Sequence, residues 1–276
     1  MDADQLLQNS DSVQVVCLLP LRLMGRNADR LPQLGGERLA AIYEDPDSLA
    51  RAFSGVERVL IVSGYAEPGK RSKLHKNALD AAAEAGVSHI VYLSFLSASL
   101  NSLFPMGRDH FWSEEYLRAT GVPFTSLRDS FYLDLIPDMF NACAGLEAMR
   151  VSWVARDDVI RVVATVLENP AGREGTFDIT GPESLTLQDT ATQVSSLTGR
   201  QLRYEIESIE EGRAWRSRLG APAWEVDTWL GSYEAIAAGE LGRVSEAVFE
   251  ITGAAPMNLR SYFSSRPALI EKLRQS

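Results

Sequence analysis

The chain has 276 residues, 45% hydrophobic and 23% charged, which suits one large domain or a domain with a smaller module. Its formal net charge of −10 argues against a nucleic-acid surface, because phosphate binding needs clustered Lys and Arg. With no apolar run of the roughly 18–20 residues that span a membrane, no basic leader and only Cys17 and Cys143 as thiols, we expect a cytoplasmic protein without nucleic-acid or membrane partners.

The first half of the chain alternates short apolar runs with helical stretches. The apolar runs are continuous and rich in β-branched residues, as in strands that helices cover on both faces. Gly55, Gly86 and Gly121 each stand where a helix ends before the next strand. The alternation predicts an α/β fold with a doubly wound parallel sheet. In chain order we expect strand 13–19, helix 47–55, strand 56–64, helix 70–86, strand 87–95, helix 111–121 and strand 122–130.

The pattern changes after about residue 146. Residues 151–170 predict a short strand and an amphipathic helix, and residues 175–206 predict strand, helix and strand, with Thr186 as the N-cap of that helix. From Ser208 onward the segments are helical and rich in Trp and Tyr. We therefore expect a Rossmann-like domain over 1–146, and over 147–276 strands that complete the sheet plus a mostly helical substrate-binding module.

Ligands of open parallel sheets bind beyond the carboxyl ends of the strands, so the residues after each apolar run are candidates for the site. A GxGxxG or GxxGxxG pattern is absent from the sequence. That absence argues against a complete dinucleotide site. The candidates at the predicted strand ends are Arg22, Ser63, Gly64, Tyr65, Ser94, Phe95, Asp129, Phe131 and Tyr132.

The segment GYAEPGKR, residues 64–71, nearly matches the phosphate loop of nucleoside triphosphatases. Its last position is Arg71, which cannot hold magnesium as a Ser or Thr hydroxyl does. Glu67 adds a negative charge and Pro68 lacks an N–H where backbone amides should bind phosphate. We interpret the segment as a solvated loop after a strand.

The Tyr and Lys pair of short-chain dehydrogenases, Y-x-x-x-K, is also absent. His110 and Glu114 instead stand four residues apart on one helix face. An imidazole near neutrality can donate a proton beside a hydride donor. The alternative is a surface histidine with a neighbouring carboxylate. His75 and His89 are expected to be structural.

Five segments share features with one known family: GVERVLIVSG, KNALDAAAEAGVSHIVYLSFL, EEYLRATGVPFTSLRDSFYLDL, residues 151–186 and the tail AGELGRVSEAVFEITGAAPMNLRSYF. Together they resemble the NmrA-like atypical short-chain dehydrogenases, a group that includes NAD(P)H-dependent quinone and azo-dye reductases and redox-sensing regulators. The resemblance implies a Rossmann domain that binds NADP or NAD and a function as an oxidoreductase of quinone-like or other conjugated small molecules. A degenerate redox-sensing or regulatory protein without catalysis is the alternative.

The resemblance also implies roles for the candidate residues. His110 and Tyr132 would serve proton transfer, while Asp129, Phe131 and Trp224 would face the substrate. Asp129 replaces the usual Asn or Pro of the group, and we expect it to add a negative charge near the nicotinamide. Cofactor contacts would come from Arg22, Ser63, Gly64, Tyr65, Ser94 and Phe95.

The start of the chain differs from the group. Residues 13–19 resemble the second strand, so we expect the first strand and its glycine-rich loop to be missing. That loop supplies the amides that bind a pyrophosphate, and we therefore expect weak NADPH binding. The acceptor, the preference between NADPH and NADH, and the oligomeric state stay open.

Overall fold

A computed structural model describes residues 21–34, 36–137, 144–145, 150–202 and 204–275. The chain forms two compact units, each assembled from separate stretches of sequence. Among the helices in these ranges, none combines the length and the apolarity needed to cross a membrane. The first unit comprises Met1–Ser94, Asp109–Leu127 and Ile160–Phe177, and the second comprises Phe95–Arg108, Arg128–Val159 and Asp178–Ser276.

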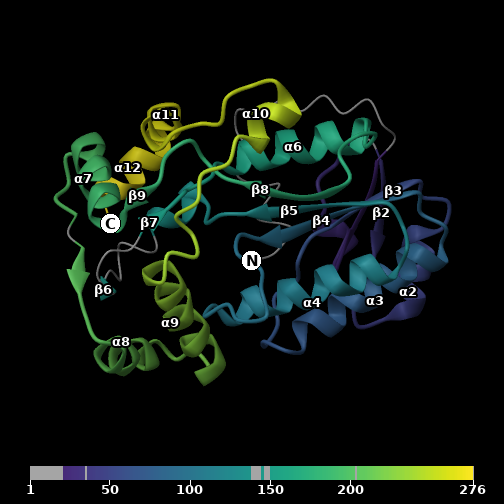
Figure 1. Ribbon diagram of the computed structural model, residues 1–276, viewed down its shortest axis with the longest axis horizontal. Helices are drawn as coiled ribbons and strands as arrows, with labels where there is room; N and C mark the ends of the chain where they lie inside the picture. Colours follow the sequence, from purple (N-terminus) through teal and green to yellow (C-terminus); the bar gives the residue numbers. More distant parts are fainter. Residues whose placement is uncertain (1–20, 35, 138–143, 146–149, 203, 276) are drawn as a thin grey trace. The chain divides into compact units, whose positions relative to one another are not determined.

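A four-stranded sheet runs in the order β3-β4-β5-β8. β3 and β4 pair in parallel, with Arg58 opposite His89 and Ile61 opposite Tyr92. Figure 1 shows α3 and α4 on one face of the strands and α6 on the other. The predicted doubly wound α/β class is confirmed. The bounds are β3 Arg58–Ile61, β4 His89–Phe95, β5 Phe124–Asp129, β8 Gly175–Ile179, α3 Arg71–Glu84, α4 Pro105–Ala119 and α6 Arg156–Glu168.

Two strands of the first unit were not expected from the sequence. β1 (Arg22–Gly25) runs parallel to β2 (Glu37–Ala40), and within the described residues these two strands form a ladder of their own. The short 3-10 helix η1 (Ala28–Arg30) lies between them in sequence. Both strands are four residues long, carry charges and bury little, so they lack the apolar run that marked the other strands. The strand predicted over 13–19 lies outside the described residues.

Local sequence signals account for the helix ends of the first unit. The Asp45 side chain accepts hydrogen bonds from the N–H groups of Asp47 and Ser48 and so caps α2 (Pro46–Phe53). The three predicted helix-ending glycines, Gly55, Gly86 and Gly121, have φ angles of 70°, 74° and 71°. Their left-handed conformation is confirmed, and it is one that residues with a Cβ rarely adopt.

The inner face of α3 follows the helical period. His75, Ala78, Leu79 and Ala82 are spaced i, i+3, i+4 and i+7, and all four are buried. α4 repeats the spacing with a buried set that is mostly polar, namely His110, Ser113, Glu114 and Leu117. Polar side chains therefore occupy core-facing positions of both helices, and each needs a hydrogen-bond partner.

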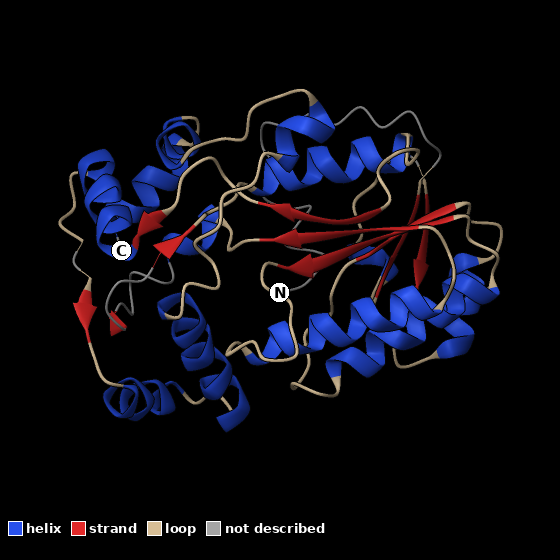
Figure 2. Ribbon diagram, in the orientation of Figure 1, coloured by secondary structure: helices blue, strands red, loops and turns tan. Residues whose placement is uncertain are grey.

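The second unit is mostly helical, as Figure 2 shows. The predicted N-cap Thr186 is confirmed: it forms a capping box with Asp189 at the start of α7. The core gathers around Trp153, Ile236 and Phe263. The bounds are η2 Leu133–Leu135, β6 Ala144–Gly145, β7 Arg150–Val151, β9 Leu185–Thr186, α7 Leu187–Thr198, β10 Glu205–Ile206, α8 Ile209–Arg216, η3 Ser217–Leu219, α9 Ala223–Ala237, α10 Ala247–Thr252, α11 Leu259–Ser264 and α12 Pro267–Gln275.

Candidate functional site

The turn after β3 is held by side chains of α3. The Gly64 N–H donates to Nε2 of His75 at 3.0 Å, and the Gly64 carbonyl accepts from Nε of Arg71 at 2.6 Å. Ser63 is half-buried and Tyr65 is exposed at the start of the loop. Both backbone polar groups of this strand-end glycine are thus fixed by buried side chains, which sets the local path of the chain.

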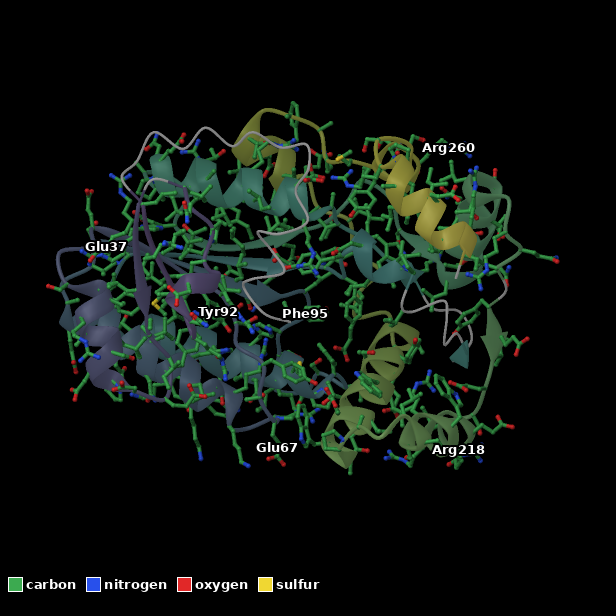
Figure 3. All side chains as sticks on the ribbon, turned by 180° about the vertical axis from the view of Figure 1, so that it is seen from behind. Glu37, Glu67, Tyr92, Phe95, Arg218 and Arg260 are labelled. Atoms are coloured by element: carbon green, nitrogen blue, oxygen red, sulfur yellow. The ribbon has the colours of Figure 1, made fainter. Side chains whose placement is uncertain are left out.

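A buried hydrogen-bonded group, which we call the histidine cluster, extends from this turn and consists of Arg71, His75, Tyr92, His110 and Ser113. Arg71 Nη2 lies 3.0 Å from Nε2 of His110, and Nδ1 of His110 lies 3.0 Å from the Tyr92 oxygen. Nδ1 of His75 lies 2.8 Å from Ser113 Oγ and 3.1 Å from the same Tyr92 oxygen. Figure 3 shows Tyr92 inside the first unit, whereas Glu37 and Glu67 lie at its periphery.

These contacts assign the protons of both imidazoles. Nε2 of His75 accepts from a backbone N–H and Nε2 of His110 faces a guanidinium, which can only donate. Each ring is therefore neutral with its proton on Nδ1. Burial, then the charge of Arg71, holds the pKa of His75 well below its ordinary value. Burial also lowers the pKa of Arg71.

The far end of the loop is held by α4. The Gly69 N–H donates to both carboxylate oxygens of Asp109, at 2.9 and 3.1 Å. A phosphate-binding loop leaves such an amide open for its ligand, whereas this one binds a protein carboxylate. The loop is solvated where Lys70 pairs with Glu67. The predicted solvated loop therefore describes the middle of the segment, while Arg71 at its end is buried.

His110 and Glu114 bond to different groups. His110 is 3% exposed, which excludes the alternative of a surface histidine. Glu114 is buried and accepts from Ser94 Oγ at 2.7 Å and from Ser126 Oγ at 3.0 Å. The predicted site residue Ser94 thus uses its hydroxyl to hold a buried carboxylate of α4.

A second buried group, the Asp129 cluster, lies in the second unit and consists of Asp129, Tyr132, Asp134 and Arg156. The Tyr132 hydroxyl donates to Oδ2 of Asp129 at 2.7 Å. Nε of Arg156 donates to Oδ2 of Asp134 at 2.5 Å, and its guanidinium lies 4.3 Å from the centre of the Tyr132 ring. The structure therefore joins two predicted site residues, Asp129 and Tyr132, by a direct hydrogen bond.

The charge expected at Asp129 is not what its surroundings favour. Burial raises the pKa of Asp129 to about 8, against the opposing effects of the Tyr132 hydrogen bond and the Arg156 charge. A carboxyl group with this pKa is mostly neutral at pH 7. The expected negative charge does not agree with this raised pKa, and the reason is that the side chain is only 2% exposed, which sequence alone does not show.

Aromatic rings surround Phe131 in the second unit. Its ring centre lies 5.1 Å from that of Phe95, 6.1 Å from that of Phe104 and 6.4 Å from that of Trp153. Phe95 and Phe131 are partly exposed. The predicted residue Trp224 lies half-buried in the first turn of α9.

The two arginines near β1 occupy different positions. Arg22 begins β1 and donates to Glu37 and to the carbonyls of Ala52 and Ser54, so its nitrogens serve structure. Arg26 directly follows the carboxyl end of β1, and its side chain is 67% exposed. Arg22 was predicted in place of Arg26 because the strand that places Arg26 at the ligand-binding edge has no apolar run in the sequence. In the described ranges, no group of three His, Cys, Asp or Glu residues is arranged to hold a metal ion.

Residues 5–170 match the NAD(P)H-binding family, which is more than half of the chain. The chain belongs to this family. It is 26% identical to quinone oxidoreductase 2 of Escherichia coli strain K12, over 91% of this chain and 88% of that protein. It is also 26% identical to an NmrA-like family domain-containing oxidoreductase of Aspergillus flavus, over 83% of this chain and 78% of that protein. The resemblance to the NmrA-like group is confirmed.

A solved structure supports the same assignment. The NADPH-dependent quinone oxidoreductase of Escherichia coli, crystallised with NADPH, superposes with a TM-score of 0.81 at 26% identity. The match covers 91% of this chain and 92% of that chain. It therefore spans residues of both compact units.

Proposed function

We propose that the protein is an NAD(P)H-dependent oxidoreductase that reduces quinone-like or other conjugated small molecules. The observation that carries the proposal is the length of its similarity to quinone oxidoreductase 2, which covers 91% of this chain. If the two proteins shared only a nucleotide-binding fold, their sequence similarity would be restricted to the first part of the chain. Similarity that continues through the second unit supports a common substrate-binding part as well.

The described residues fit the adenosine end of the cofactor better than its pyrophosphate. Arg26 is exposed at the carboxyl end of β1, and its nearest carboxylate oxygen, on Glu44, is 3.9 Å away. A guanidinium can bind a phosphate through two parallel hydrogen bonds, so we assign Arg26 to the 2′-phosphate of NADPH. Ser63 can offer backbone just after β3, whereas the N–H and the carbonyl of Gly64 are already bonded to His75 and Arg71. The sequence offers no glycine-rich loop, so the expectation of weak pyrophosphate binding stands.

The second unit fits a flat acceptor. Partly exposed Phe95 and Phe131 offer ring faces on which a conjugated molecule can stack. Bound NAD(P)H supplies a hydride. Of the two predicted proton donors, Tyr132 is half-buried and bonded to an acid, and we assign the proton to it. A proton role for His110 stays a prediction, because both of its ring nitrogens are engaged inside the protein.

The test of this function is nucleotide oxidation. The purified protein should oxidise NADPH in the presence of a benzoquinone or naphthoquinone, followed by the loss of nicotinamide absorbance. Absence of oxidation above the protein-free rate, with either NADPH or NADH, would contradict the proposal.

The test of Arg26 is cofactor preference. Arg26→Ala should weaken NADPH binding by about tenfold, since a charge-assisted phosphate contact contributes roughly 1.5–3 kcal/mol before screening by salt. NADH binding should change less than about twofold. Arg30→Ala, which removes another exposed arginine of the same unit, is the matched control and should change neither value. Fluorescence titration of both nucleotides measures the effect, and equal weakening of both would remove Arg26 from the phosphate site.

A further inference from the structure

Asp129 combines three features that a structural carboxylate does not need. It ends β5, the edge of the sheet where ligands bind in such folds. Its side chain is buried, and Oδ2 has one hydrogen bond, to the Tyr132 hydroxyl at 2.7 Å. Oδ1 is buried and lacks a hydrogen-bond partner in the described structure. An ionised carboxylate with a single hydrogen bond is costly to bury, so this arrangement favours the protonated acid.

Among the residues that the structure describes, no cation forms an ion pair with Asp129. Nε of Arg156, from α6, bonds to Asp134 instead, and the guanidinium stacks on the Tyr132 ring. Beyond them lie Tyr262 of α11 and the ion pair of Arg266 with Asp157. The raised pKa of Asp129 agrees with this geometry, because burial outweighs the favourable effects of Tyr132 and Arg156.

We propose that Asp129 is the proton reservoir of Tyr132, and that the pair delivers the proton that a reduced oxygen acceptor requires. This inference rests on the proposed function. When Asp129 is protonated, its O–H can donate to the Tyr132 oxygen across the same 2.7 Å, which leaves the Tyr132 O–H directed to the acceptor.

The step balances in atoms and electrons. A hydride from the reduced nicotinamide brings one electron pair to the acceptor. The acceptor oxygen takes the Tyr132 proton, the Tyr132 oxygen takes the Asp129 proton, and Asp129 remains as a carboxylate until water returns a proton. The positive charge of Arg156 favours that transient carboxylate.

Tyr132 is a poor acid without this reservoir. Burial, then the adjacent Asp129, raises the pKa of Tyr132 well above its ordinary value. A relay from the carboxylic acid avoids a free tyrosinate. An amide cannot release a proton as a carboxylic acid does, so Asp129→Asn is a matched variant of nearly the same size.

The experiment uses two acceptors that differ in their need for a proton. A neutral naphthoquinone needs a hydride and a proton, whereas a cationic triarylmethane dye needs only a hydride, because its product is neutral. With the quinone, Asp129→Asn should lower kcat by roughly 10- to 100-fold and remove the limb of the pH profile near pH 8. With the dye, its rate should stay within about twofold of the parent. Tyr132→Phe should reproduce the quinone defect.

Asp178→Asn is the control, because Asp178 of β8 pairs with the exposed Arg243 and has no place in the relay. It should change neither rate. An equal loss with both acceptors in Asp129→Asn would overturn the relay, as would an unchanged rate with the quinone.

A second measurement does not require turnover. Infrared difference spectra between the parent and Asp129→Asn, taken across the pH range, should reveal one carboxylic acid that ionises near pH 8. An Asp129 already ionised at pH 6 would overturn the inference. If the parent reduces neither acceptor, the proposed function fails, and the infrared titration still decides the state of Asp129.

Discussion

The two buried polar clusters differ in which of their groups remain unsatisfied. In the histidine cluster, both imidazoles have a partner on each nitrogen, and the unpartnered atom is Nη1 of Arg71. In the Asp129 cluster, the buried atoms without a hydrogen-bond partner in the described structure include two carboxylate oxygens, Oδ1 of Asp129 and Oδ1 of Asp134, beside Nη1 of Arg156. Arginine cannot lose its proton in a protein, whereas a carboxyl group can gain one. The first cluster therefore has a fixed protonation state, and the second can exchange protons.

The largest expected effect is a pH dependence that originates in Asp129. The folded protein keeps a proton up to about pH 8 that the unfolded chain loses near its ordinary pKa of 3.8. The free energy of unfolding should therefore fall as pH rises through this window, by as much as about 6 kcal/mol at ~1.4 kcal/mol per pKa unit. Asp129→Asn should remove this slope and be more stable than the parent at pH 8. Urea denaturation at several pH values measures it, and parallel curves for the two proteins would refute it.

A smaller effect is expected when the histidine cluster loses a member. His75→Ala leaves the Gly64 N–H and Ser113 with an empty space between them, and should cost about 2–4 kcal/mol. His75→Gln, whose Oε1 can still accept from Gly64, should cost less. Chemical denaturation near pH 7 measures both, and equal losses would mean that the Gly64 hydrogen bond adds nothing.

Removing one hydroxyl from each cluster separates their roles. Tyr92→Phe leaves Nδ1–H of His110 without its acceptor, so stability should fall by about 1–3 kcal/mol while the folded protein keeps its activity. Tyr132→Phe should cost less than about 1.5 kcal/mol in stability and lower quinone turnover instead. Denaturation and steady-state rates on the same preparations compare them. If the two variants lost stability and quinone turnover to the same extent, the two clusters would not have the different roles proposed for them.

The smallest effect is expected at the exposed ion pair of the segment 64–71. Lys70 pairs with Glu67 while both side chains are largely solvated. Lys70→Ala should change stability by less than about 0.5 kcal/mol. A loss of more than about 1 kcal/mol in the free energy of unfolding would show that this ion pair constrains the segment more than an exposed pair normally does.

The sequence predicted those elements whose signal is local. The runs 56–64 and 87–95 are continuously apolar, and Gly55 and Thr186 mark helix ends by their own chemistry. β1 and β2 were missed because each has only four residues and begins with a charged one, so neither contains such a run. Once β1 was missed, Arg26 was not recognised at a strand end.

The polar clusters were partly accessible from the sequence. The spacing of His75 with Ala78, Leu79 and Ala82 places this histidine on the apolar face of its helix, which already indicates burial. Its partners could not be inferred, because Gly64 and Tyr92 reach it from two different strand segments. The raised pKa of Asp129 follows from its burial, and no local pattern in the sequence reports that burial.

The two ends of the loop between Gly64 and Gly69 are held by side chains from outside the loop. Arg71 and His75 hold the first glycine by its backbone, and Asp109 holds the second by its N–H. Residues 65–68 lend no side chain to these anchors, although the Glu67 carbonyl accepts from the N–H groups of Lys70 and Arg71 at 3.0 and 3.2 Å. The side chains of segment 65–68 can therefore be exchanged, in evolution or in a designed library. Such changes would alter the surface beside β3 and leave the sheet itself in place.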